Sequence, residues 1–179
     1  FIQHDYKYLI YSSLQDFLRK IPVVDTLLCS ILFFPDKTVH RLEKPYKSEI
    51  NIENDPLADC QQNLIFLNLL IEHINNLPRD IKNVIFQLVK TDGRFSGIFS
   101  FVKHAVAQKD VLPDLGNLFQ LTNVEKLKYI SINQPSELAI AVSYLYHRQK
   151  SLAPYILHTF PGVVKIIQVI NNLRAPLDV

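Results

Sequence analysis

LIFLNLLIEHINNLPRDIKNVIFQLV, residues 64–89, establishes the helical character of this chain. Its first part, 64–77, is apolar on nearly every side, which is typical of a helix surrounded by other helices. The second part carries one apolar stripe at three- and four-residue spacing, as in an amphipathic helix. The stripe consists of Ile81, Val84, Ile85, Leu88 and Val89. We therefore predict a central helix over 64–77, followed by a helix that packs through one face.

Helical periodicity recurs on both sides of this stretch, upstream at residues 24–32 and downstream at 138–146 and 163–173. Pro135, Pro154 and Pro161 separate the later helices, because proline lacks the amide proton that a helix interior needs. The periodicity predicts an all-α protein, a compact bundle of about seven to nine helices. We expect a single helical domain over residues 1–179.

Two helix starts carry capping signals. Asp55 before Pro56 predicts an N-cap followed by proline at the first helical position. Thr122 and Glu125 have the spacing of a capping box, in which each side chain accepts from a free amide of the first turn.

Composition limits the class of protein. The chain has 179 residues, of which 48% are hydrophobic and 20% charged, as expected for a globular domain with a sizeable core. The net charge is +2 and the basic residues form no stripe, so we predict no nucleic-acid binding. No apolar run reaches the length of a membrane span, and we predict no transmembrane segment. The opening FIQHDYKYLI lacks the pattern of a signal peptide.

The chain has two cysteines, Cys29 and Cys60, too few for a disulfide framework. Both lie in apolar helical patterns, so we expect small buried core residues. We therefore expect an intracellular, cytoplasmic location, where thiols stay reduced.

Residues 35–56, PDKTVHRLEKPYKSEINIENDP, form a charged excursion between apolar segments. Alternation at its end predicts either a small β-hairpin at 38–53 or a surface loop. The excursion concentrates cationic side chains and imidazole at Lys37, His40, Arg41, Lys44 and Lys47. If they converge on one concave face, they would bind anionic lipid headgroups. A peripheral membrane or phosphoinositide-binding helical domain is therefore an alternative function.

Sequence signatures of catalysis are absent. The chain has no phosphate-binding glycine loop, zinc-protease motif or nucleophile elbow, and its histidines are isolated in sequence. We predict no catalytic residue, no metal ligand and no cofactor. A second alternative is an enzyme whose site is assembled from dispersed residues, which would need a pocket that joins Cys or His to a carboxylate.

Residues 77–89, LPRDIKNVIFQLV, carry a more specific pattern. It runs Leu-Pro, one residue, an acid, an aliphatic, three residues, Ile-Phe, two residues and an aliphatic. These places are filled by Leu77, Pro78, Asp80, Ile81, Ile85, Phe86 and Val89. The pattern resembles the first half of an F-box. The second half of the segment 77–104 departs from that family, because Gly93 and Gly97 intervene before Val102-Lys103-His104.

The resemblance implies a protein partner, the Skp adaptor of cullin–RING ubiquitin ligases, bound through Leu77, Pro78 and the neighbouring apolar side chains. Residues 105–179 would then position or contact a substrate. This interface requires that Leu77 and Pro78 are accessible in the isolated domain or are covered by a partner chain. We therefore predict a non-catalytic protein-interaction domain, of which an F-box-like ubiquitin-ligase adaptor is the most specific version.

Overall fold

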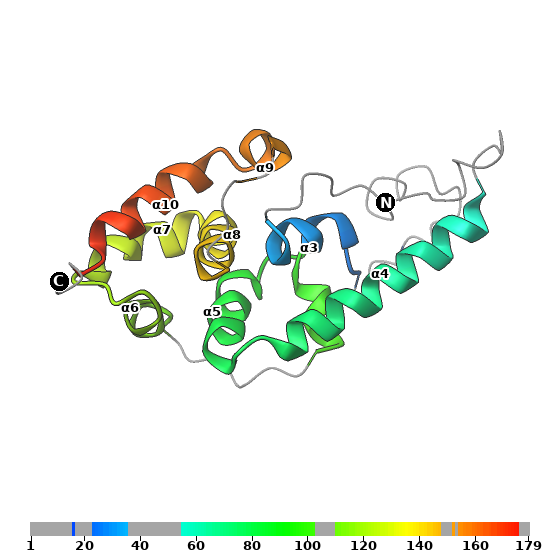
Figure 1. Ribbon diagram of the computed structural model, residues 1–179, viewed down its shortest axis with the longest axis horizontal. Coiled ribbons are helices and arrows are strands. Elements are labelled where there is room, and N and C mark those ends of the chain that lie inside the picture. Colours follow the sequence, from blue (N-terminus) through cyan, green and yellow to red (C-terminus); the bar gives the residue numbers. More distant parts are fainter. Residues whose placement is uncertain are drawn as a thin grey trace.

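The computed structural model describes residues 16, 23–35, 55–102, 110–147, 152 and 154–175. These residues form eight α-helices and two 3-10 helices (Figure 1), which confirms the predicted all-α class. The predicted hairpin at 38–53 lies outside the described residues. The helices are α3 (Thr26–Phe33), α4 (Pro56–Asn76), α5 (Arg79–Val89), η3 (Ser96–Ser100), α6 (Leu112–Phe119), η4 (Val124–Leu127), α7 (Lys128–Asn133), α8 (Pro135–Tyr146), α9 (Pro154–Thr159) and α10 (Gly162–Leu173).

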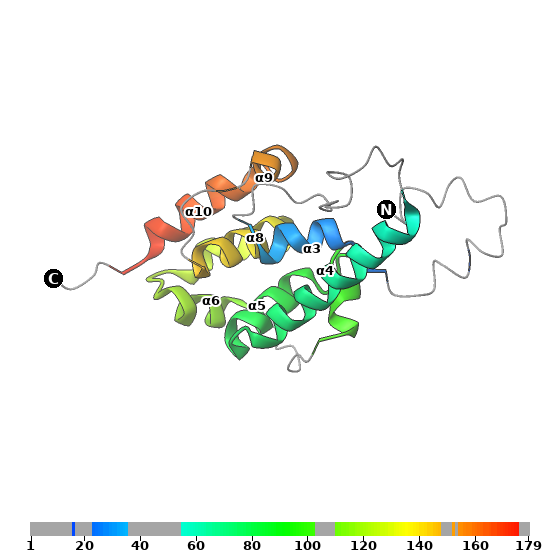
Figure 2. The same ribbon diagram turned by 45° about the vertical axis from the view of Figure 1, so that its right-hand side comes forward.

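Helix α8 occupies the centre of the described fold. Its residues from Leu138 to Ser143 are all buried. It packs against α3, α5, α7 and α10, and Figures 1 and 2 show α10 and α5 on opposite sides of it. A helix that is apolar all round must be covered on all sides. The run Leu-Ala-Ile-Ala-Val at 138–142 therefore accounts for the central place of α8.

The prediction that 64–77 is a central helix is wrong, because α4 lies at the edge of the fold. Of its 21 residues, Leu70 and Ile74 are buried. Leu57, Leu64, Ile65 and Leu69 are exposed, with Leu64 at 60%. The views in Figures 1 and 2 agree that the N-terminal turns of α4 project past α3. The apolar character of α4 thus leaves large hydrophobic side chains at the surface.

Helix α5 packs through one face, as its stripe predicts. Ile81, Val84, Ile85, Leu88 and Val89 are all buried. The helix contacts α8 most extensively and α6 as well. The α5 stripe, defined by these five residues, is therefore part of the core.

Of the two predicted helix caps, the structure confirms the one at Asp55 and contradicts the one at Thr122. Asp55 Oδ1 accepts from the amides of Leu57 at 2.9 Å and Ala58 at 3.2 Å, which confirms the N-cap of α4. The capping box at Thr122 is wrong, because its hydroxyl donates to the carbonyl of Leu173 at 3.0 Å. The end of α10 thus provides a long-range acceptor that the local pattern does not reveal.

We expect Ile140→Ala, at the centre of α8, to lower the free energy of unfolding by about 2–4 kcal/mol, since it leaves a cavity where four helices meet. Ile132→Ala is the matched control, because Ile132 on α7 is 69% exposed. Urea unfolding followed by circular dichroism measures both values. Equal losses for the two variants would contradict the central place of α8.

Candidate functional site: a pocket between α3, α4 and the turn after α5

A pocket of about 380 Å³ opens between the start of α3, the middle of α4 and the turn that follows α5. The chain before and at the start of α3 lines it with residues 23–27, and α4 contributes Asn63, Leu64 and Leu67. Gly93 and Arg94 in the turn complete the described lining. Leu64 is exposed at the mouth, so the hollow continues into the uncovered apolar surface of α4.

The pocket exists because α3 and α4 lie side by side and run in the same direction. Near the start of α3, Thr26 Oγ1 donates to Asn63 Oδ1 at 3.2 Å. Just beyond its end, the Phe34 and His73 rings pack with centroids 4.6 Å apart. Asp25 caps α3 by accepting from the Leu28 amide at 3.0 Å. These contacts fix the wall that α3 and α4 share.

A glycine brings η3 close to this wall. A Cβ added at Gly97 would collide with the carbonyl of Val23, which lines the pocket. Glycine at this position therefore permits a backbone-to-backbone approach that no other residue allows without displacement.

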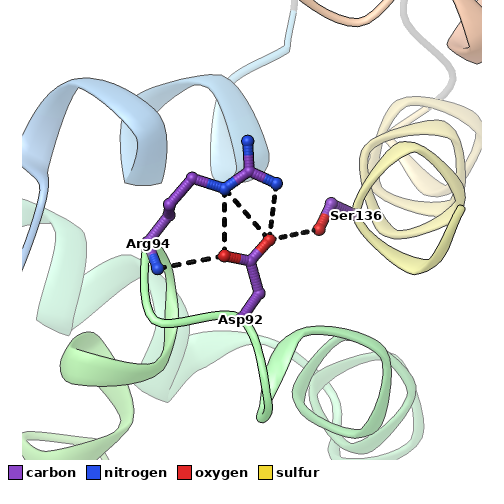
Figure 3. A network of polar contacts seen from close by, with 3 residues as sticks. All are labelled: Asp92, Arg94 and Ser136. Carbon is purple, nitrogen blue, oxygen red and sulfur yellow. Dashed lines mark hydrogen bonds and ion pairs between the residues drawn. The ribbon is translucent and has the colours of Figure 1, made fainter.

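A polar network holds the turn that forms the rim of the pocket (Figure 3). Asp92 Oδ1 accepts from the backbone amide of Arg94 at 3.0 Å and from its Nε at 2.9 Å. Asp92 Oδ2 accepts from Arg94 Nη2 at 2.6 Å and from the Ser136 hydroxyl at 2.7 Å. Because Ser136 lies in the first turn of α8, the network ties the rim to the central helix.

Charge and ring contacts strengthen the network. Burial alone would raise the pKa of Asp92, but the hydrogen bonds from Arg94 and Ser136 outweigh it and hold the pKa at about 2. The Arg94 guanidinium also lies 5.6 Å from the ring centroid of Phe95 and 5.8 Å from that of Phe160. One arginine therefore connects the rim, the core and the segment between α9 and α10.

The polar side chains that line the pocket already have partners within the chain. Asp25 caps α3, Thr26 and Asn63 bond to each other, and Arg94 pairs with Asp92. The rest of the described lining is apolar apart from Gly93. Because each of these side chains is engaged through at least one atom and the other lining side chains are apolar, the pocket suits an apolar group.

The structure divides the predicted F-box residues between core and surface. Leu77, Ile81, Ile85 and Val89 are buried, Phe86 is half-buried, and Pro78 and Asp80 are exposed. The required accessibility of Leu77 is not met, since its side chain is 7% exposed and belongs to the core of its own chain. The apolar part of the predicted Skp interface is thus turned toward α8 and α6 in this conformation.

The residues predicted to bind anionic lipid, Lys37, His40, Arg41, Lys44 and Lys47, lie outside the described residues, as do His104 and Lys103. Phe34, at the edge of that segment, is half-buried against Phe66 and His73. The lipid-binding alternative stays a prediction.

The two cysteines differ. Cys29 in α3 is fully buried, as predicted, and burial raises the pKa of its thiol to about 12, so the thiol is neutral. Cys60 on α4 is exposed, which contradicts the expectation of a core residue. Cysteine and histidine are both missing from the described lining of the pocket. Within the described residues, no group of three or more His, Cys, Asp and Glu could hold a metal ion.

No protein-family model, no curated protein and no solved structure matches the chain. Among the described helices, none is long and apolar enough to cross a bilayer.

We expect Asp92→Asn to lower the free energy of unfolding by about 1–3 kcal/mol at neutral pH, because Arg94 loses its charged partner. The folded pKa of about 2 lies below the ordinary value of 3.8, so the unfolded chain takes up the proton first. The contribution of Asp92 is therefore present above pH 4 and disappears as the pH falls toward 2. Urea unfolding at a series of pH values measures it.

Asp80→Asn is the control for this variant, since Asp80 is exposed at the start of α5. It should keep the acid-dependent loss of the unmodified protein, whereas Asp92→Asn should flatten it. A profile of Asp92→Asn parallel to that of the unmodified protein would exclude the proposed role of the network.

Proposed function

We propose that this protein is a non-catalytic protein-interaction domain that binds a helix of its partner through the α3–α4 pocket. The observation that carries the proposal is the pairing of every polar side chain in the described lining, beside leucines exposed at the mouth. At a site of this kind, a complex is stabilised by the burial of apolar surface rather than by the orientation of a polar substrate.

The shape of α4 supports a helical partner. Leu57 and Leu64 lie seven residues apart, two turns along one line of the helix, which is about 10 Å. Cys60 lies between them on the same line and is also exposed. A helix docked in a groove presents apolar anchors at similar intervals. One large aliphatic or aromatic anchor would enter the pocket, and the flanking turns would cover Leu57 and Cys60.

The same surface supports a hot-spot interface. Binding energy concentrates where one apolar anchor is fully desolvated and the surrounding contacts exclude water. Here the hollow is bounded by Leu64 and Leu67 on one side and by Leu27 on the other. The Arg94–Asp92 pair at the rim would supply a polar edge.

The Skp adaptor is a narrower version of the same proposal, and its support is the resemblance of 77–89. Pro78 and Asp80 are exposed at the start of α5, but the α5 stripe would have to leave the core to take part. A partner that uses the α3–α4 pocket requires no such rearrangement.

The test of the pocket starts from helical peptides selected by phage display on the immobilised protein, whose affinities are then measured by fluorescence polarisation. We expect Leu64→Glu to weaken binding at least about tenfold, because it places a carboxylate at the mouth of an apolar pocket. Leu157→Glu is the matched control, since Leu157 on α9 is 44% exposed and is not among the lining residues. Circular dichroism checks that both variants fold.

Selected peptides that bind Leu64→Glu as tightly as the unmodified protein would overturn the proposal. Equal loss in Leu157→Glu would do so too, because it would reveal nonspecific hydrophobic adsorption.

The Skp version is tested by calorimetric titration with the purified adaptor. We expect Ile85→Ala to cost about 2–4 kcal/mol of stability, as for a core residue, and Pro78→Ala to leave the fold intact. Binding that is lost in folded Pro78→Ala would support the adaptor role. The absence of binding at tens of micromolar would remove it and leave the pocket proposal standing.

A further inference from the structure

Two histidines far apart in sequence meet at the end of the α3–α4 pair. The rings of His73 on α4 and His147 after α8 pack with centroids 5.5 Å apart. His73 also packs against Phe34, and Tyr146 lies edge-on to His147 with centroids 5.1 Å apart. An aromatic cluster that includes two titratable rings thus joins the ends of three helices.

The environment of His73 favours the neutral ring. Its Nε2 atom is shielded from solvent and has no hydrogen-bond partner among the described residues. A neutral imidazole tolerates a vacant acceptor, whereas an imidazolium carries a proton on both nitrogens and needs an acceptor for each. Burial lowers the pKa of His73, and a charge on His147 lowers it further.

The helices packed around His73 bring no compensating charge from their described residues. Between Thr26 and Phe33, α3 has no charged side chain, and its titratable Cys29 is neutral. The acid of α8, Glu137, lies ten residues before His147, about 15 Å away along the helix. Glu72, next to His73 on α4, is exposed to solvent. Protonation of His73 is therefore opposed by its neighbour and compensated by none of these groups.

We propose that the His73–His147 pair is an acid-sensitive latch, which holds the C-terminal half of α4 against α3 and α8 while both rings are neutral and releases it in mild acid. In mild acid the proton enters His73 more readily once the ring has left the shielded site, where its pKa is lowered. Because His73 projects from α4, the departure of its ring breaks the contacts that α4 makes through it with Phe34 and His147.

The direction of the pH effect follows from linkage. The released form has the ordinary histidine pKa near 6.5, and the closed form has a lower one. As the pH falls below 6.5, the released form binds the proton first, so the ratio of closed to released molecules drops by up to roughly tenfold per pH unit. The drop continues until the pH reaches the pKa of the closed form.

The latch has a consequence for the pocket, and this part alone rests on the proposed function. Asn63, Leu64 and Leu67 lie on the same helix as His73 and form one wall of the pocket. Movement of α4 in mild acid would open that wall and weaken partner binding.

The experiment needs no partner, so its result is separate from the fate of the proposed function. Histidine ring signals are titrated by NMR, and amide protection of residues 70–76 is measured at pH 7.5 and 5.5 after correction for intrinsic exchange. We expect His73 to titrate below the ordinary histidine pKa of 6.5, and protection in α4 to fall several-fold in acid. In His73→Phe, which keeps an aromatic ring beside Phe34, the fall should disappear.

Two further variants make the test decisive. His147→Gln removes the like charge and should raise the pKa of His73, which can be measured even if His73→Phe fails to fold. His158→Gln, an exposed histidine on α9, should change neither reading. The latch is refuted if His73 titrates at or above the ordinary histidine pKa of 6.5, if its pKa is unchanged in His147→Gln, or if folded His73→Phe loses as much protection as the unmodified protein.

Discussion

The burial of α8 on all sides is the constraint on which the rest of the structure depends. Its central run from Leu138 to Val142 has no polar face, so the helix is stable only when other helices surround it. Four helices do so, and α3 is one of them. Because α3 already covers α8, α4 packs on the outer side of α3 and keeps part of its own apolar surface exposed. The candidate binding surface on α4 is thus a consequence of the packing of α3 against α8.

The same constraint explains the polar network. Ser136 is buried at the start of α8, and a buried hydroxyl without a partner would be costly. Asp92 provides the acceptor, and Arg94 compensates the charge that this places inside. Arg94 also lines the pocket. Asp92, which accepts from the buried Ser136 hydroxyl, therefore also positions the rim through Arg94. Core and candidate site are therefore connected through a single turn.

Local patterns in the sequence predict the helical class, the α5 stripe and the Asp55 cap, because each depends on residues within two turns of one another. They do not tell which of two apolar helices is central, since 64–77 and 138–146 look alike until their neighbours are known. The contact of Thr122 with Leu173 and the pairing of Asp92 with Ser136 are likewise long-range. So is the approach of His73 to His147.

The F-box resemblance is a second case in which a local pattern does not identify what a helix packs against. Its pattern asks for aliphatic residues at helical spacing after Leu-Pro, and a core helix that begins with proline meets the same requirement. Ile81, Ile85 and Val89 are fully or almost fully buried by their own chain. Sequence spacing alone does not distinguish a stripe that binds a partner from one that binds the rest of its own domain.

Native-state hydrogen exchange at neutral pH in increasing urea tests the central place of α8 most directly. The amides of residues 138–143 should exchange slowest and only through global unfolding, since every covering helix must leave before they open. Those of the first turns of α4, which project past α3, should exchange through local opening at a lower free energy. Protection in α4 equal to or greater than that in α8 would contradict the account.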